Sequence, residues 1–571
     1  MTYIDARKAY DTVWREGNYV RLFDLGVQGK MWRQIQAMGA RLRSKVRLPF
    51  GETEWFDVRR GVAQGAAESP WLYSNFINGL AEKLKERGLG VMTGGMRTPL
   101  LMYADDIVMM ASNMEELHKM NAVATQYAFE NRFRHNGDKS AVMVFNASKE
   151  LKGLVQEQRW VLSGERVEVK SEYKYLGVDV LSNSANWRTH MERVTRKARF
   201  RSNDLLWMCR GDQGIRPRSA VTLWKAIVRP ILEYAAELWA DEIPLDLIKK
   251  AEKVQTDFAR GMLALTGKNA AANDFVRAEL GLETLQARWR KLRLGYWRRV
   301  QVAHPARALS VVAKMRREQV VNMGALGRGS WMWGIRRLLQ QADLAEHWYA
   351  PALTTEQCKS KWKDAVYEGV EEMHEAERRT RMQGLSSMVR YGRIKYWGKM
   401  DAARAQFTGE IGQRGALVCE RYMDDIRERT GCHLKLLCRA GCLPVLGNIA
   451  RERKWQQDWA RCMMCGSGAV EDMPHLLLEC EAYAEHRDRL IRKAGSALNS
   501  QNSREQQVQV LLGARLDNKD EEDNVDHAVK RFLKKAWRVR KALTGSLNEA
   551  LGRSDFLGHK RNEVVQSNFN T

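Results

Sequence analysis

The sequence predicts an α+β domain in about its first 180 residues, followed by a long region made mainly of helices. Three short apolar runs in the first part have the length and composition of buried strands, at Leu100–Tyr103, Ile107–Met110 and Ala141–Phe145. Helical stretches occur beside these runs, and such a mixture favours an α+β domain. From about residue 185 to 455 the chain is rich in Arg, Lys, Leu, Ala and Trp and has few prolines, which predicts helices.

The composition indicates a partner rich in phosphate. The 571 residues include 94 Lys and Arg against 69 Asp and Glu, so the formal net charge is +25. A surplus of this size suits nucleic acid, because bound cationic side chains release counterions from the phosphate backbone. A soluble protein with one basic face would show the same balance. The length is sufficient for roughly two to four domains.

The sequence favours a nuclear or cytoplasmic protein that is neither secreted nor inserted in a membrane. Asp5 lies where the apolar part of a signal peptide would begin. No run approaches the roughly twenty apolar residues that span a bilayer. The nine cysteines, an odd number, argue against a disulfide framework and for a reducing compartment.

Two adjacent carboxylates, Asp105 and Asp106, lie between two apolar runs of strand length. The simplest structure is a β-hairpin with both aspartates at its tight turn. Two neighbouring charges between buried strands are costly unless a cation neutralises them. The alternative is an ordinary turn rich in aspartate.

A third carboxylate, Asp5, follows a short apolar strand and precedes an expected helix. One carboxylate from a strand and two from a hairpin can hold two divalent cations roughly 4 Å apart. Such a pair activates a 3′-hydroxyl and stabilises the pyrophosphate that leaves a nucleotide. Oxygen ligands completed by substrate phosphates suit Mg²⁺.

A glycine-containing loop lies between these carboxylates in the sequence. Gly61 and Gly65 permit close approach of the backbone to a ligand. Ser69 is then expected as the N-cap of a helix and Pro70 as its first residue. Many proteins contain such a loop before a helix, so this segment is informative only together with the others.

In this order, the segments resemble the palm of reverse transcriptases, and most closely those of non-LTR retrotransposons. The resemblance covers about the first 240 residues well and continues more loosely to about residue 490. Five motifs carry it, namely Tyr3–Asp11, Gly61–Pro70, Tyr103–Asp106, Asn136–Phe145 and Tyr173–Gly177.

The resemblance implies an RNA-directed DNA polymerase that uses an RNA template, a DNA primer and deoxynucleotides. Asp5, Asp105 and Asp106 match the metal-binding triad, which implies two Mg²⁺ ions. Tyr10 matches the aromatic residue that screens the 2′-position of the sugar. The remaining matches are Gln64 and Gly65 in the nucleotide-binding loop, Lys139 near the leaving pyrophosphate, and Tyr175, Leu176 and Gly177 in the hairpin that grips the primer.

The resemblance also implies a domain order. A right-hand polymerase palm over 1–182 would precede thumb-like helices over 183–245, a basic helical linker over 246–455, a zinc knuckle over 456–490 and a charged helical tail over 491–571. In this family the fingers precede the position of Asp5 and supply basic residues for the triphosphate. We therefore expect the fingers to be largely missing and this polypeptide alone to polymerise poorly or not at all. The oligomeric state is not indicated.

The middle of the chain interleaves basic and aromatic residues. Met191–Arg201 and Ser219–Trp239 are expected as thumb helices, with Pro230 kinking or splitting the second. Within Arg288–Arg299, the composition suits phosphate contacts with some base stacking. The alternative places Trp289 and Trp297 in a core and the arginines on a solvated face.

Near the C-terminal end the spacing Cys-x₂-Cys-x₉-His-x₄-Cys, formed by Cys462, Cys465, His475 and Cys480, predicts a tetrahedral zinc site. All four ligands come from protein, so the ion would be structural. Buried free thiols are the alternative. The segment also resembles the C-terminal Cys-Cys-His-Cys motif of non-LTR retrotransposon proteins. For the irregularly spaced group around Cys432, buried thiols are the preferred interpretation.

Two other functions remain compatible with these patterns. One is a catalytically inactive nucleic-acid-binding remnant or repurposed element protein, which would keep the fold and the charge. The other is a maturase of the group II intron type, against which the position and spacing of the Cys and His residues argue.

Overall fold

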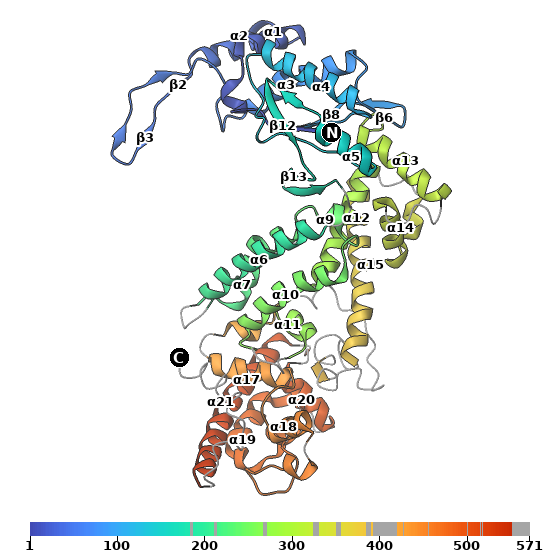
Figure 1. Cartoon of the computed structure of the whole chain (residues 1–571). Helices are drawn as coiled ribbons and strands as arrows, with labels where there is room; N and C mark the ends of the chain where they lie inside the picture. The colour runs from blue at the N-terminus through green and yellow to red at the C-terminus, as the bar shows by residue number, and fades with distance from the viewer. Residues whose placement is uncertain are drawn as a thin grey trace. The chain divides into compact units, whose positions relative to one another are not determined.

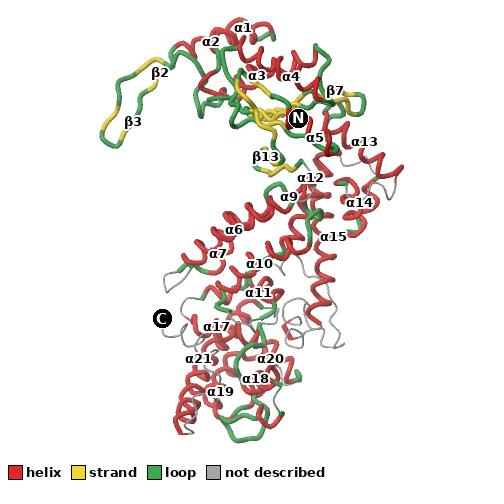
Figure 2. Tube along the Cα trace, viewed as in Figure 1, coloured by secondary structure: helices red, strands yellow, loops and turns green. Residues whose placement is uncertain are grey.

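The computed structural model describes residues 1–182, 187–209, 214–265, 271–323, 330–349, 356–383, 390–391, 419–425, 428–454, 456–498, 501–513, 516 and 518–550. The chain forms two compact units. The first unit comprises Met1–His190 and Trp297–Gly334, and the second comprises Met191–Tyr296 and Ile335–Thr571. Figure 1 shows the strands gathered in the first unit, and Figure 2 shows the second as almost entirely helical.

The first unit is built on a six-stranded sheet with the strand order β11-β12-β10-β1-β9-β8. Strand β1 runs antiparallel to both β9 and β10, whereas β10 and β12 are parallel. The predicted strands are therefore present, although β10 ends three residues earlier than expected. The strands are β1 (Thr2–Ile4), β8 (Leu100–Tyr103), β9 (Asp106–Met109), β10 (Ala141–Val142), β11 (Trp160–Leu162) and β12 (Glu165–Val169).

Side chains alternate between the two faces of this sheet. On β1, Ile4 belongs to the main core, together with residues of helices α3 (Ser69–Glu86) and α4 (Met114–Glu130). Its neighbour Tyr3 belongs to a smaller cluster that includes side chains of a separate β-hairpin. The main core therefore fixes the end of β1, where Asp5 follows.

Further elements of the first unit surround this sheet. They are a 3₁₀ turn at Ala9–Thr12, α1 (Arg15–Asp24), α2 (Gly29–Ala40), β2 (Arg43–Ser44), β3 (Arg47–Leu48), β4 (Gly51–Glu52), β5 (Phe56–Asp57), β6 (Val91–Thr93), β7 (Met96–Thr98), α5 (Lys149–Glu157), β13 (Glu172–Tyr175), β14 (Val178–Leu181) and α13 (Ala308–Met323).

Apart from isolated β-bridges, the regular secondary structure in the described part of the second unit consists of helices. Its longer helices are α6 (Arg188–Met208, which starts in the first unit), α7 (Pro217–Leu223), α8 (Arg229–Glu233), α9 (Ala236–Trp239), α10 (Leu245–Met262), α11 (Asn273–Glu279), α12 (Leu285–Gln301, which ends in the first unit), α14 (Trp331–Gln341, which starts in the first unit), α15 (Glu356–Gln383), α17 (Arg429–Arg439), α18 (Leu446–Arg453), α19 (Ala484–Ala494), α20 (Arg504–Leu512) and α21 (Lys519–Ala550).

Pro230 splits the apolar helical stretch as predicted. A wide π-helical turn at Trp224–Val228 precedes it, and Pro230 then lies in the first turn of α8. The π-turn and the proline have a common basis, because Pro lacks the N–H that a continuous α-helix would need.

The charged sequence near the C-terminal end forms one helix that packs against other helices. In α21, which contacts α17 and α19, apolar residues such as Phe532 and Leu533 are buried. The Lys530 ammonium lies 2.7 Å from the Asp425 carboxylate and 2.6 Å from that of Asp526. Acidic and basic residues that look like a solvated tail in the sequence therefore form ion pairs along a packed helix.

None of the helices within the described residues is both long enough and apolar enough to cross a membrane.

Candidate catalytic carboxylates and a candidate metal centre

The turn between β8 and β9 carries two of the predicted carboxylates. Tyr103 pairs with Asp106, so Ala104 and Asp105 form a two-residue turn. Asp105 is exposed, and Asp106 is half-buried as the first residue of β9. Ala104 has a φ of 54°, which costs a residue with a Cβ about 1 kcal/mol. The prediction that both aspartates lie at the turn is confirmed, with Asp106 also beginning the strand.

Asp5 follows the neighbouring strand at the same end of the sheet. The register pairs Ile4 of β1 with Ile107 of β9, which places Asp5 level with Asp106. Its backbone is held on both sides, because its N–H donates to Ser140 Oγ at 3.2 Å and its carbonyl accepts from Asn136 N at 2.8 Å. The fold therefore positions this carboxylate through hydrogen bonds of the backbone, leaving the side chain half-buried beside the turn.

The carboxylates influence each other's protonation. Burial raises the pKa of Asp5, and the nearby charge of Asp105 raises it further, while Lys139 and Asn136 act in the opposite direction. Burial also raises the pKa of Asp106, followed by the charges of Asp105 and Asp5. Three carboxylates thus repel one another at one end of the sheet, and oxygen donors in this arrangement suit a divalent cation.

Lys139 lies beside these carboxylates. Its side chain is exposed, and its positive charge partly offsets the rise that burial causes in the pKa of Asp5. Its carbonyl accepts a 2.9 Å hydrogen bond from the Tyr173 hydroxyl of β13. The structure therefore brings Lys139, Asp5 and the β13–β14 hairpin together.

The turn of that hairpin contains the predicted primer-gripping residues. Tyr175 pairs with Val178, and Leu176 and Gly177 between them have φ values of 47° and 77°. Positive φ at both turn residues matches the right-handed twist of a two-residue hairpin. The glycine accepts this conformation without strain, while Leu176 does not.

Two tyrosines hold this hairpin against the sheet. The ring of Tyr173 stacks on that of Tyr3 with centroids 4.5 Å apart, and the ring of Tyr175 meets Tyr3 edge-on at 5.4 Å. Burial, followed by the charges of Asp5 and Asp106, raises the pKa of Tyr173 to about 12. The hairpin consequently lies close enough to the carboxylates for their charges to affect the pKa of Tyr173.

The loop before α3 approaches the segment after Asp5. A Cβ on Gly61, whose φ is 86°, would lie 2.8 Å from the Cα of Asp11. The amide Nε2 of Gln64 donates to the Asp11 carboxylate at 3.2 Å, and Gly65 is exposed with a φ of 89°. The half-buried Tyr10 stacks on Tyr73, with ring centroids 5.1 Å apart. The predicted nucleotide-binding residues are therefore gathered around one loop.

The expected helix start in this loop was wrong by one residue. Helix α3 begins at Ser69, with Glu68 as its N-cap, and no side chain caps it. The Ser69 hydroxyl instead donates to the carbonyl of Ala63 at 2.6 Å, which closes the loop. This bond satisfies the hydroxyl within the loop, so Ser69 acts as the first helical residue and Pro70 as the second.

Arg15 organises the same loop, and no sequence pattern indicated its role. The buried guanidinium donates to the carbonyls of Gly61 at 2.6 Å, Gly39 at 2.7 Å, Val58 at 2.7 Å and Arg60 at 3.1 Å. All its partners are backbone carbonyls, which any sequence provides, so no pattern of side chains could reveal the contact.

The segment that interleaves arginine with tryptophan is mostly core. Trp289 and Trp297 are buried, which confirms the core interpretation of these rings. The accompanying expectation of a solvated arginine face is wrong for Arg293, which is fully buried with its guanidinium 2.6 Å from Glu242. Arg290 likewise lies 2.8 Å from Asp241. Acidic residues earlier in the chain neutralise this basic run.

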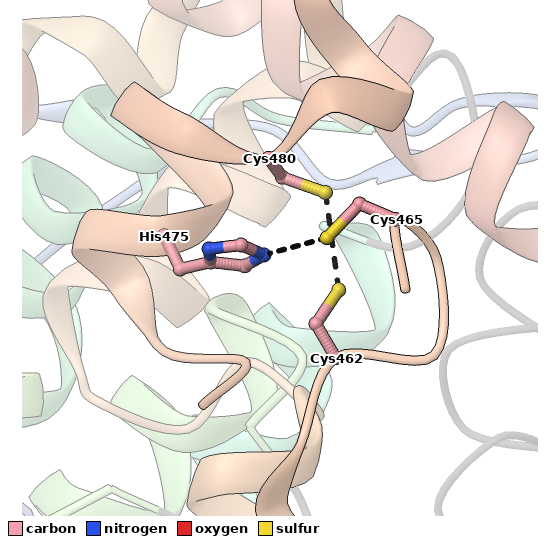
Figure 3. A group of neighbouring side chains, drawn as sticks. All are labelled: Cys462, Cys465, His475 and Cys480. Atoms are coloured by element: carbon pink, nitrogen blue, oxygen red, sulfur yellow. Dashed lines mark hydrogen bonds between the residues drawn. The ribbon is translucent and has the colours of Figure 1, made fainter. Parts of the chain in front are cut away.

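The predicted zinc ligands converge in the second unit. Ligand atoms of Cys462, Cys465, His475 and Cys480 all lie within 4.8 Å of one another. The sulfurs of Cys462 and Cys480 are 3.8 Å apart, and Nε2 of His475 lies 3.4 Å from the Cys465 sulfur. Figure 3 shows the four side chains pointing toward one another.

Local structure explains this convergence. The two cysteines of the first pair flank a turn, and Gly466 and Gly468 after it have φ values of 63° and 73°. The chain then returns, with Cys462 N donating to the Ala469 carbonyl at 2.7 Å. His475 begins one wide helical turn, His475–Glu479, and Cys480 directly follows it. His475 and Cys480 therefore lie at the two ends of this turn.

The cluster also favours at least one thiolate. Burial opposes ionisation of Cys465, but hydrogen bonds from Ser467, Cys462 and His475 lower its pKa to about 6. Burial raises the pKa of Cys480, and the neighbouring sulfurs of Cys462 and Cys465 raise it further. Three sulfurs and one imidazole nitrogen in a mainly buried cluster suit a tetrahedral zinc ion, which would remove this conflict.

The group around Cys432 contains buried thiols. Cys432 and Cys438 are buried along α17, and burial raises the pKa of each to about 12. The Cys432 thiol donates to the carbonyl of Tyr422 at 2.9 Å.

Comparison with known proteins bears on the first unit. Residues 1–180 match the family model described as reverse transcriptase (RNA-dependent DNA polymerase). The chain is 24% identical over 244 residues to the RNA-directed DNA polymerase from mobile element jockey of Drosophila funebris, covering 42% of this chain and 25% of that protein. It is 30% identical over 112 residues to the retrovirus-related Pol polyprotein from type-1 retrotransposable element R2 of Popillia japonica, covering 19% of this chain and 16% of that protein. The chain thus spans a quarter or less of these relatives.

Proposed function

We propose that this chain, whose first 180 residues form a reverse transcriptase domain of the non-LTR retrotransposon type, adds deoxynucleotides to a primer on an RNA template. The observation that carries the proposal is that Asp5, Asp105 and Asp106 lie together at one end of the sheet. These groups come from two strands that the main core holds in register. Their repulsion suits a site completed by cations and substrate.

In this proposal the three carboxylates hold two Mg²⁺ ions. The ions would activate the 3′-hydroxyl of the primer and stabilise the charge on the leaving pyrophosphate. The chain's contribution is to orient the carboxylates, since the hydrogen bonds from Ser140 and Asn136 fix the backbone of Asp5. Lys139, exposed beside them, would hold a proton and a positive charge near the pyrophosphate.

Other residues would select and position the substrates. Tyr10, braced by Tyr73, would clash with a 2′-hydroxyl and so favour deoxynucleotides over ribonucleotides. Gln64 and Gly65 in the exposed loop would contact the incoming nucleotide. The turn formed by Tyr175, Leu176 and Gly177 would hold the primer end, since this hairpin lies beside the carboxylates.

The remaining domain assignments are also proposals. Helix α6, at the start of the thumb-like segment 183–245, has exposed cations suited to phosphates at Arg196, Lys197, Arg199 and Arg201. Segments 246–455 and 491–571 would serve as a helical linker and a helical tail around the knuckle at 456–490. Cys462, Cys465, His475 and Cys480 would hold one zinc ion in a structural role.

A primer-extension assay tests the proposed function. The full chain, with Mg²⁺, an RNA template and a DNA primer, is compared with Asp105→Asn and with Asp24→Asn, a matched change of an exposed aspartate in α1. We expect extension by the wild type, even if slow, to be retained in Asp24→Asn and to fall more than a hundredfold in Asp105→Asn, because a metal ligand is lost. Equal extension by all three chains, or no extension by the wild type, would favour the inactive nucleic-acid-binding alternative.

A further inference from the structure

A two-stranded β-arm, defined as residues 41–60, extends from the first unit between α2 and the Gly61 loop. Strand β2 pairs with β5, and β3 pairs with β4. Figure 1 shows this arm, with β2 and β3 labelled, reaching away from the sheet and the helices that cover it. An isolated two-stranded hairpin is only marginally stable in water. Its surface is therefore a candidate for contact with a partner.

Large aromatic side chains are exposed along the arm. Phe50 at its tip is 86% exposed, Trp55 is 53% exposed and Phe56 is 48% exposed. Three exposed aromatic residues within seven positions are unusual on a surface with no binding role. Their rings are available for stacking, and Lys45 already lies over the Trp55 ring with its ammonium 5.2 Å from the ring centroid.

The arm is also strongly basic. It carries six cations, Arg41, Arg43, Lys45, Arg47, Arg59 and Arg60, all exposed, against three acidic residues, Glu52, Glu54 and Asp57. The ion pairs along it are largely exposed. Arg43 pairs with Asp57 at 3.3 Å, and Glu52 pairs both with Arg47 at 3.6 Å and with Lys45. Exposed pairs of this kind hold little energy, so a phosphate can compete for the arginines.

Arg15 connects both ends of the arm to the loop before α3. Its guanidinium binds the carbonyl of Gly39 before the arm, those of Val58 and Arg60 within it, and that of Gly61 directly after it. A strand bound along the arm would thus be held in a fixed relation to the Gly61 loop.

We propose that the β-arm binds single-stranded nucleic acid. Bases would stack on Phe50 at the tip and on Trp55, and phosphates would contact Arg43 and Arg47. Phe56 pairs with Ser44 and therefore lies on the opposite face of the arm. Aromatic faces combined with cations form the usual surface for unpaired strands, because every base has a face that can stack. The combination of six cations with exposed rings favours this partner over a protein, since the centre of a protein interface is depleted of charge. The proposal goes beyond polymerisation, because the arm would bind a strand whether or not the chain turns over.

Binding of fluorescent oligonucleotides to the full chain tests the proposal. Anisotropy titrations with an oligo-U RNA, an oligo-dT DNA and a blunt duplex compare the wild type with Phe50→Ala/Trp55→Ala. We expect the double change to weaken binding of both single strands about tenfold or more, because each stacked base contributes about 1–3 kcal/mol. We expect a smaller effect on the duplex, which offers no free base faces. RNA and DNA strands weakened to different extents would show which of them the arm prefers.

Two matched controls separate this role from nonspecific effects. Phe129→Ala in α4 removes an equally exposed ring from the same unit and should leave binding unchanged. Arg43→Gln/Arg47→Gln should reduce the slope of log K against log salt concentration by about 1.4. The control Lys85→Gln/Arg87→Gln should change this slope less. Its two residues are exposed, in the last turn and at the C-cap of α3. The melting temperature of each variant should match the wild type, since the arm contributes nothing to the main core.

The outcome that overturns the proposal is wild-type affinity in both arm variants. Loss of self-association in the same variants, measured by light scattering, would instead assign the arm to contact between copies of the chain. The Asp105→Asn chain should bind oligonucleotides as tightly as wild type. Failure of the proposed polymerisation and failure of strand binding by the arm are therefore observed in different variants.

Discussion

The two candidate metal sites of this chain differ in nearly every physical respect. The carboxylates come from positions about a hundred residues apart in the sequence, offer only oxygen, and are exposed or half-buried. The Cys and His ligands come from one short segment, Cys462–Cys480, and three of the four are buried. One site is assembled by the tertiary fold of a sheet, whereas the other is assembled by two local turns.

This difference indicates how readily each site would exchange its metal ion. A site with three protein carboxylates leaves coordination positions for substrate oxygens, and Mg²⁺ exchanges readily from it. Four protein ligands leave no position open, so zinc would be retained and would contribute to folding. The first site is therefore expected to tolerate loss of its metal, and the second is not.

The largest effect is expected from removal of a cluster ligand. Cys480→Ser should abolish zinc binding and destabilise the second unit by several kcal/mol, because binding free energy at a structural zinc site is folding free energy. Elemental analysis of zinc and limited proteolysis would measure both effects. Cys209→Ser, at a half-buried thiol outside the cluster, is the control and should retain the zinc. A Cys480→Ser chain with full zinc content would contradict the assignment.

A smaller destabilisation is expected from a buried ion pair next to the cluster. Arg540 of α21 lies 3.0 Å from the buried carboxylate of Glu471, which also accepts from Leu446 N at 2.7 Å. Arg540→Met leaves this carboxylate without its cation and should cost about 3–5 kcal/mol. Denaturant titration would measure the loss. Recovery of most of the stability in Arg540→Met/Glu471→Gln would confirm that the unpaired charge is the cause.

At the carboxylate site, replacing a metal ligand is expected to stabilise the metal-free protein instead of destabilising it. Asp106→Asn removes a like charge from its neighbours, so the melting transition of the first unit should lie about 2 °C higher in EDTA, which removes zinc from both chains alike. The gain should disappear when Mg²⁺ and template–primer are added, because the wild type is then stabilised by its ions. Calorimetry on both chains, with Asp24→Asn as the control, would show this. A variant that melts lower than wild type in EDTA would argue against repulsion among the carboxylates.

The smallest expected effect is the change with pH of the gain in melting temperature that Asp106→Asn brings. The pKa values of Asp5 and Asp106 are raised in the folded chain, so folding binds protons at these sites. Their protonated forms favour the folded state, and this contribution is lost as pH rises from the ordinary aspartate range through the raised pKa values. The difference in melting temperature between Asp106→Asn and wild type in EDTA should therefore grow between pH 4.5 and 7. A difference in melting temperature that shrinks over this range would contradict the raised pKa values of Asp5 and Asp106.

Much of both sites could be predicted because their signals are local. The apolar runs around Asp105 predict a hairpin, and the spacing of Cys462, Cys465, His475 and Cys480 predicts a shared zinc site. The start of α3 was misplaced because the hydroxyl of Ser69 binds Ala63, a choice that depends on loop geometry. The contacts of Arg15 could not be predicted, since its partners are backbone carbonyls in segments distant along the chain. Arg293 was misjudged because its neutralising partner, Glu242, lies 51 positions earlier.

The most direct test of the central claim is Mn²⁺ binding at the carboxylate site, measured by electron paramagnetic resonance. Zinc-loaded wild type, Asp105→Asn and Asp24→Asn are titrated with Mn²⁺ in the presence of template–primer. We predict that the wild type and Asp24→Asn bind Mn²⁺ alike, and that Asp105→Asn binds it at least tenfold more weakly, about 1.4 kcal/mol. Equal binding by all three chains would contradict the assignment of Asp5, Asp105 and Asp106 as the catalytic metal ligands.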